Sequence, residues 1–114
     1  MAFRIGIIGT GIMGKAGGRI FQLIEDVEVT ALADLSEKNL TEAAAELQVS
    51  ATYSSYQDML EKEQLDAVYV ATPDMYHRAP VIDSLEAGCH VIVEKPMTTR
   101  QEDAEEIYRL VAQT

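Results

Sequence analysis

Three glycines near the start of the chain, Gly9, Gly11 and Gly14, have a spacing that could hold a phosphate group. They follow a mostly apolar run, residues 3–8, and begin an amphipathic stretch, which puts them at a strand-to-helix turn. Gly9 would permit a tight turn, Gly11 would let a pyrophosphate approach the main chain, and Gly14 would let the helix pack closely on the strand. The positive end of the helix dipole would then face the ligand's negative charge. The turn therefore predicts a dinucleotide-binding site.

A carboxylate stands where such a site needs one. Asp34 follows a second apolar run, residues 27–33, and lies about twenty residues after Gly14. In a dinucleotide fold this residue takes the adenosine ribose hydroxyls and disfavours a 2′-phosphate. Asp34 could also simply be stabilised by the dipole of the helix that follows, and both roles can hold together. No arginine comes directly after it, although Lys38 could weaken the preference, so we expect NAD rather than NADP.

Two further polar segments follow expected strands. Thr72, Pro73 and His77 come after an entirely apolar run, residues 67–71. Because parallel sheets bind ligands outside the carboxyl ends of their strands, this segment should gather beside the glycine turn. The alternative for His77 is a partly exposed histidine in the first turns of a helix.

Glu94 and Lys95 come after the next expected strand, residues 91–93. A lysine there could polarise an alcohol oxygen, or share its proton, while hydride leaves carbon. The alternative is an exposed lysine paired with Glu94. We interpret Lys95 as the candidate catalytic residue.

Strand-like and helical patterns alternate along the chain. The expected strands are residues 3–8, 27–33, 51–53, 67–71 and 91–93. The expected helices are residues 12–25, 37–47, 56–62 and 74–87, with a last one after Thr99. Alternation implies parallel pairing with right-handed crossovers. The sequence thus predicts an α/β fold with a doubly wound parallel sheet of strand order 3-2-1-4-5, and no sixth strand within this chain.

The first expected helix carries an apolar stripe near one face. Its members are Ile12, Ala16, Ile20, Leu23 and Ile24. This spacing is the periodicity of a helix.

The order of these segments resembles the Gfo/Idh/MocA family of NAD(P)-dependent oxidoreductases. The glycine turn, Asp34, the Thr72–Pro73 segment and above all the Glu94-Lys95-Pro96 triplet carry the resemblance, which covers essentially the whole chain but only the family's N-terminal Rossmann domain. It implies hydride transfer between a nicotinamide cofactor and a sugar, cyclitol or similar polyol. It also implies a C-terminal substrate domain that these 114 residues do not contain. The chain alone is therefore expected to bind cofactor with little or no turnover.

The resemblance also implies a set of site residues. The amides of the turn would hold the pyrophosphate, and Lys95 would reach the nicotinamide ribose and the substrate hydroxyl. The implied cofactor-binding residues are Gly9, Thr10, Gly11, Ile12, Met13, Gly14, Asp34, Thr72, Pro73, His77, Glu94 and Lys95.

Composition narrows the function further. The net charge of −10 argues against a nucleic-acid partner, which needs a basic patch.

The longest apolar run is too short to cross a bilayer and no leader is visible, so we expect a cytoplasmic protein. We expect it to consist of one dinucleotide-binding domain, residues 1–114. The only cysteine, Cys89, reads as a small buried residue, and its spacing from His77 and His90 does not suggest a metal site. Apolar residues at helical spacing near the C-terminus, residues 107–111, would allow a homo-oligomer.

Other functions share part of this pattern. A non-catalytic dinucleotide-binding or redox-sensing module would need the glycine turn and Asp34 but not Lys95. An interaction domain with a vestigial nucleotide site would need neither the glycine turn nor Asp34 to bind its partner. Another Rossmann enzyme, such as an amino-acid-pathway reductase, would lack the Glu94-Lys95-Pro96 triplet.

Overall fold

A computed structural model describes residues 2–72 and 78–93 of the chain. The strands are β1 (Phe3–Ile8), β2 (Val27–Ala33), β3 (Thr52–Tyr53), β4 (Ala67–Val70) and β5 (His90–Val93). The helices are α1 (Ile12–Gln22), α2 (Glu37–Leu47), α3 (Tyr56–Lys62) and α4 (Arg78–Glu86). The helix expected after Thr99 and the start of the helix expected at Asp74 lie outside the described residues.

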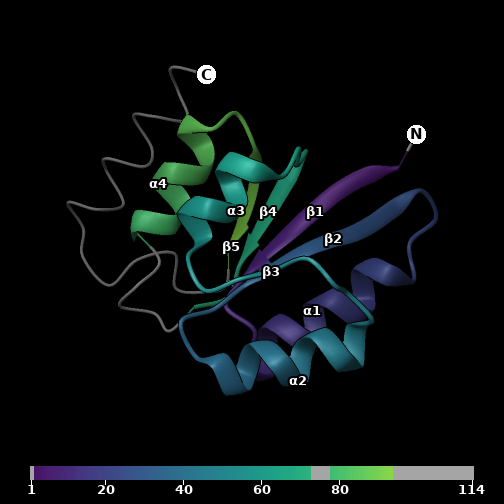
Figure 1. The fold of residues 1–114 in the computed structure, drawn as a ribbon. Coiled ribbons are helices and arrows are strands. Elements are labelled where there is room, and N and C mark those ends of the chain that lie inside the picture. Colours follow the sequence, from purple (N-terminus) through teal and green to yellow (C-terminus); the bar gives the residue numbers. More distant parts are fainter. Residues whose placement is uncertain (1, 73–77, 94–114) are drawn as a thin grey trace.

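The described strands form one parallel sheet of order β3-β2-β1-β4-β5, as the alternating pattern predicts. Figure 1 shows α1 and α2 on one face of this sheet and α3 and α4 on the other. The chain moves outward from β1 to β3 and then returns to β4 on the far side of β1. The glycine turn between β1 and α1 therefore lies where the direction of winding reverses, which is where open parallel sheets bind ligands.

Each face of the sheet has its own apolar core. On the α1 and α2 side, Ile5 and Ile7 pack with Leu40 and Leu47 of α2. On the other side, Met59 of α3 belongs to a second cluster that contains residues of β2, β4 and α4. All residues of β4 are buried, because helices cover both of its faces.

A shift in the pairing of β1 with β2 decides which β2 residues enter which core. Ile5 pairs with Val29, but the next residue, Gly6, pairs with Ala31, so Thr30 is an extra residue in the ladder. Val29 and Leu32 consequently lie in the same cluster although three positions separate them. A regular strand would put these two side chains on opposite faces.

Capping interactions delimit two of the described helices. The Ser36 hydroxyl accepts a hydrogen bond from the Asn39 N–H at 3.2 Å, which caps α2. After α4, Gly88 adopts a positive φ of 87°, and the Cys89 N–H donates to the Ser84 carbonyl. This left-handed glycine ends the helix and turns the chain toward β5.

Some predicted boundaries were wrong by a few residues. The first helix ends at Gln22 rather than at residue 25, because the N–H groups of Leu23 and Ile24 bond to carbonyls only three residues back. Asp26 then takes a positive φ of 65° and turns the chain into β2. The fourth strand ends at Val70, and β5 begins at His90.

The apolar stripe of the first helix does not form its contact with the sheet. Ile12, Ile20 and Leu23 are 82%, 60% and 86% exposed, whereas Gly14 and Gly18 are buried. The glycine face approaches the sheet so closely that a Cβ at Gly17 would lie 2.3 Å from the Tyr69 ring. Phe21 supplies the large apolar contact, with its ring edge-on to Tyr69 at a centroid distance of 5.4 Å. The apolar stripe therefore faces away from the sheet.

We expect substitutions on the two sides of α1 to differ sharply in cost. Phe21→Ala should lower the free energy of unfolding by about 3 kcal/mol, because it deletes the ring that packs on Tyr69. Leu23→Ser should change it by less than about 0.5 kcal/mol, because the side chain is exposed. Urea unfolding followed by circular dichroism measures both. Equal costs would contradict the observed orientation of the helix.

Candidate functional site

The glycine turn is built by two close main-chain approaches. Gly9 has a positive φ of 95°, and a Cβ there would lie 2.6 Å from the Ala71 carbonyl carbon and the Thr72 nitrogen. A Cβ on Gly14 would lie 1.9 Å from the Gly9 carbonyl oxygen. The fold itself therefore requires these two glycines. Gly9 lets the turn approach the main chain that follows β4, and Gly14 lets the start of α1 approach the turn.

Gly11 differs from both of its neighbours in the motif. A Cβ added at Gly11 would meet no other atom within 4 Å, and its φ of −73° is open to any residue. Nothing in the described structure requires a glycine here. A glycine is required where a ligand must approach the main chain more closely than a Cβ allows.

The amino-terminal end of α1 is open. Gly11 is its N-cap and makes no side-chain capping bond, and the first turn of the helix contains no acidic residue. Ile12 and Met13, the first two helical residues, are 82% and 52% exposed. The N–H groups of a first helical turn have no carbonyl partner within the helix, so an anion can take them.

Asp34 is fixed beside this turn by three hydrogen bonds. Its Oδ2 accepts from the Thr10 N–H at 2.8 Å and from the Thr10 hydroxyl at 2.9 Å. Its Oδ1 accepts from the Ser36 N–H at 2.7 Å. The carboxylate thus joins the turn after β1 to the start of the chain that follows β2. This link could not be read from the spacing of the residues.

The carboxyl ends of β1, β4 and β5 are in register. Ile8 of β1 pairs with Val70 of β4, which in turn pairs with Val93 of β5. The glycine turn, Asp34 and Thr72 therefore come together at one edge of the sheet, the same edge at which β5 ends. Of the predicted site residues, Pro73, His77, Glu94 and Lys95 lie outside the described residues, and their roles stay predictions.

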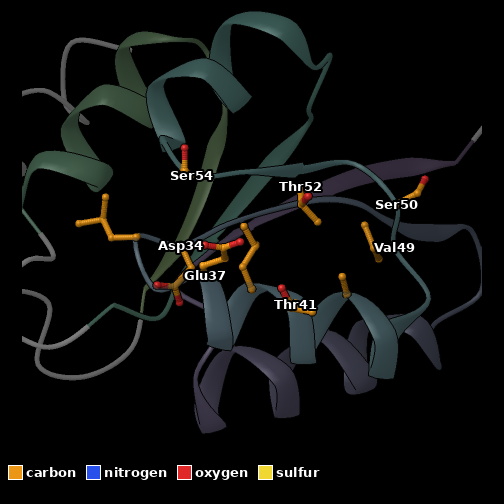
Figure 2. Close-up of a pocket in the computed structure, with 10 residues that line it drawn as sticks. Asp34, Glu37, Thr41, Val49, Ser50, Thr52 and Ser54 are labelled. Atoms are coloured by element: carbon orange, nitrogen blue, oxygen red, sulfur yellow. The ribbon is translucent and has the colours of Figure 1, made fainter.

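A groove of about 580 Å³ has Asp34 among its lining residues. Figure 2 shows it between α2 and the chain around β3, with Asp34 and Glu37 toward one end and Val49 and Ser50 at the other. Leu40, Ala44 and Val49 contribute its apolar lining. No glycine of the turn lines it, so the groove is separate from the predicted pyrophosphate site.

Other polar groups have structural partners away from this edge. The Tyr53 hydroxyl hydrogen-bonds the Glu63 carboxylate at 2.5 Å, which raises the pKa of Tyr53. Burial, and then the hydrogen bond to Asp83, raise the pKa of Tyr56. A raised pKa keeps both phenols neutral and makes them poor candidates for proton transfer at neutral pH.

Several other polar side chains have structural contacts elsewhere in the described residues. His90 stacks on Phe3 at the opposite edge of the sheet, with ring centroids 6.4 Å apart. Burial raises the pKa of the Cys89 thiol, as expected of a structural cysteine. Lys15 and Arg19 both pair with Glu46 on α2, so their charges bridge two helices.

Among the described residues, no cluster of three or more potential metal ligands occurs. No helix in the same residues is long and apolar enough to span a membrane.

Comparison with known proteins agrees with this geometry. A model of the oxidoreductase family with the NAD-binding Rossmann fold, Gfo/Idh/MocA, matches residues 3–114. The chain belongs to the Gfo/Idh/MocA family. Within that family it is the NAD-binding Rossmann domain, as the glycine turn and the Glu94-Lys95-Pro96 triplet indicated.

Two of the relatives that the chain matches are named dehydrogenases. The chain is 31% identical to myo-inositol 2-dehydrogenase of Thermotoga maritima over 111 residues, covering 97% of this chain and 32% of that protein. It is 32% identical to an NADP⁺-dependent D-xylose 1-dehydrogenase of Haloferax volcanii over 103 residues, covering 86% of this chain and 32% of that protein.

A solved structure shares the fold closely. The scyllo-inositol dehydrogenase of Lactobacillus casei, crystallised with NAD(H) and scyllo-inositol, superimposes with a TM-score of 0.92 and 29% identity. The match covers 99% of this chain and 34% of that protein. The chain thus spans about a third of the length of these relatives.

Alanine substitutions at two glycines of the turn should separate fold from ligand. Gly14→Ala should lower the free energy of unfolding by about 3 kcal/mol, because the new Cβ meets the Gly9 carbonyl oxygen. Gly11→Ala should cost about 1 kcal/mol or less, since only the N-cap preference changes. Thermal or urea unfolding tests this, and an equally large loss for Gly11→Ala would show that the fold also needs that glycine.

Proposed function

We propose that this chain binds NAD(H) at the turn formed by residues 9–14 and is the cofactor-binding part of a polyol dehydrogenase. The observation that carries the proposal is the open space at the position of a Gly11 Cβ, where the described fold does not require a glycine. The open start of α1 and the carboxylate of Asp34 beside it fit the two ends of an adenosine diphosphate.

In this proposal the main-chain N–H groups of Gly11, Ile12 and Met13 hold the pyrophosphate. They offer neutral donors, so binding does not depend on a basic side chain in a protein of net charge −10. Asp34 accepts a hydrogen bond from the adenosine ribose. The nicotinamide ring, when bound, supplies the hydride acceptor.

We assign NAD as the preferred cofactor. A 2′-phosphate would bring two negative charges toward the Asp34 carboxylate, and no cation contacts that carboxylate in the described residues. The relatives include enzymes of both kinds, so the fold alone does not determine this choice.

The proposed substrate is a secondary alcohol of a cyclitol, sugar or similar polyol. Support comes from the inositol dehydrogenases among the relatives and from the triplet that contains Lys95. Lys95 would donate a hydrogen bond to the alcohol oxygen and move its proton as hydride departs. We expect the chain alone to turn over little or no substrate. Cys89 is a buried free thiol, which suits a cytoplasmic protein.

NADH titration of the purified chain tests cofactor binding. We expect nicotinamide fluorescence to rise and saturate below about millimolar cofactor, with a dissociation constant at least about tenfold higher for Gly11→Ala. A Cβ at Gly11 blocks the approach of phosphate while leaving the fold intact. No binding by the unaltered chain would instead favour an interaction domain with a vestigial site.

Leu23→Ser is the matched control for this titration. Leu23 is the C-cap of α1, at the end of the helix away from the glycine turn, and it is 86% exposed. It should bind NADH as the unaltered chain does. A similar loss of affinity in both variants would point to a general effect on α1 rather than to a blocked turn.

Lys95→Ala distinguishes an enzyme from a sensor. In a form of the protein that carries a substrate domain, it should lower kcat by about a hundredfold or more and leave NADH affinity unchanged. The reason is that the ammonium group acts on the alcohol and not on the pyrophosphate. An unchanged rate of alcohol oxidation would favour a non-catalytic, redox-sensing module.

A further inference from the structure

We propose that Thr10 is a positioning residue that sets the preference for NAD over NADP by holding the carboxylate of Asp34 in one orientation. This inference rests on the proposed function. It differs from the role expected of Thr10 in the sequence, which was a direct contact with the cofactor.

The Thr10 side chain is hydrogen-bonded to Asp34. Its hydroxyl donates to Oδ2 of Asp34 at 2.9 Å, and its N–H donates to the same oxygen at 2.8 Å. Thr10 is only 1% exposed, so its hydroxyl is turned inward to the carboxylate rather than outward to solvent. Thr10, which lies between Gly9 and Gly11, therefore uses both of its donors to hold Asp34.

The acceptor capacity of Asp34 is almost fully used. A carboxylate offers about four acceptor positions, two on each oxygen. Thr10 occupies both positions on Oδ2, and the Ser36 N–H occupies one on Oδ1 at 2.7 Å. One position remains, on Oδ1. A ribose hydroxyl can donate to it, whereas a phosphate dianion has no proton to donate.

The main chain on both sides of this contact is held as well. The Gly9 N–H donates to the Ala33 carbonyl at 2.9 Å, and the Asp34 N–H donates to the Tyr53 carbonyl at 3.1 Å. Both partners of the Thr10–Asp34 pair are therefore anchored to the sheet. With its Oδ2 tied to Thr10, the carboxylate cannot swing away from an approaching 2′-phosphate, and the repulsion between the two charges is retained.

The test compares NADH and NADPH affinities in three proteins: the unaltered chain, Thr10→Val and Thr10→Ser. Valine keeps the shape of threonine and the N–H donor but removes the hydroxyl, whereas serine keeps the hydroxyl. We expect the ratio of the NADPH to the NADH dissociation constant to fall about tenfold in Thr10→Val and to be restored in Thr10→Ser. If Thr10→Val does not fold by circular dichroism, Thr10→Ala makes the same deletion with a smaller side chain.

A double-mutant cycle with Asp34→Asn shows whether Thr10 acts through Asp34. In the Asp34→Asn background, Thr10→Val should change the affinity ratio no further. A ratio that Thr10→Val leaves unchanged, or an equal loss of both affinities, would overturn the inference, because an equal loss places the hydroxyl on the shared pyrophosphate. If the unaltered chain binds neither cofactor, the proposed function itself fails, and this result is distinct from binding with an unchanged ratio.

Discussion

The contact on which the rest of this structure depends is the approach of main chain to main chain at the turn after β1. Gly14 lies so close to the Gly9 carbonyl that no side chain fits between them, and a side chain on Gly9 would meet the main chain of Ala71 and Thr72, just after β4. These approaches determine how deeply α1 sits on the sheet. They let Gly17 and Gly18 face Tyr69 and Leu47, and they turn the apolar stripe of the helix outward.

The same constraint shapes the candidate site. Once the turn is pressed against β4, Thr10 is buried and its donors meet Asp34 at the end of β2. Gly11, between Thr10 and α1, then has open space on the side where a Cβ would stand. One packing arrangement therefore produces both the hydrogen-bonded Thr10–Asp34 pair and the open N–H groups at the start of α1. Main-chain donors held in place before a ligand arrives favour anion binding.

Membership of the Gfo/Idh/MocA family and the NAD-binding fold are established by the match over residues 3–114 and by the superposition on an inositol dehydrogenase. The chemistry performed with the cofactor is a separate question. The relatives are about three times as long as this chain and use both NAD and NADP. What the described residues themselves contribute is a helix start without a side-chain cap and, beside it, a carboxylate held by three hydrogen bonds.

The sequence by itself determined the parallel sheet, the strand order and the glycine turn, because strands and helices alternate with strong local periodicity and glycine has few reasons to recur at that spacing. Only the tertiary structure decided which face of α1 is buried, since periodicity detects a stripe of apolar residues but not how close the helix comes to the sheet. It also decided the register of β2 around Thr30 and the partner of the Thr10 hydroxyl. These features depend on contacts between residues distant in the chain, which no local pattern encodes.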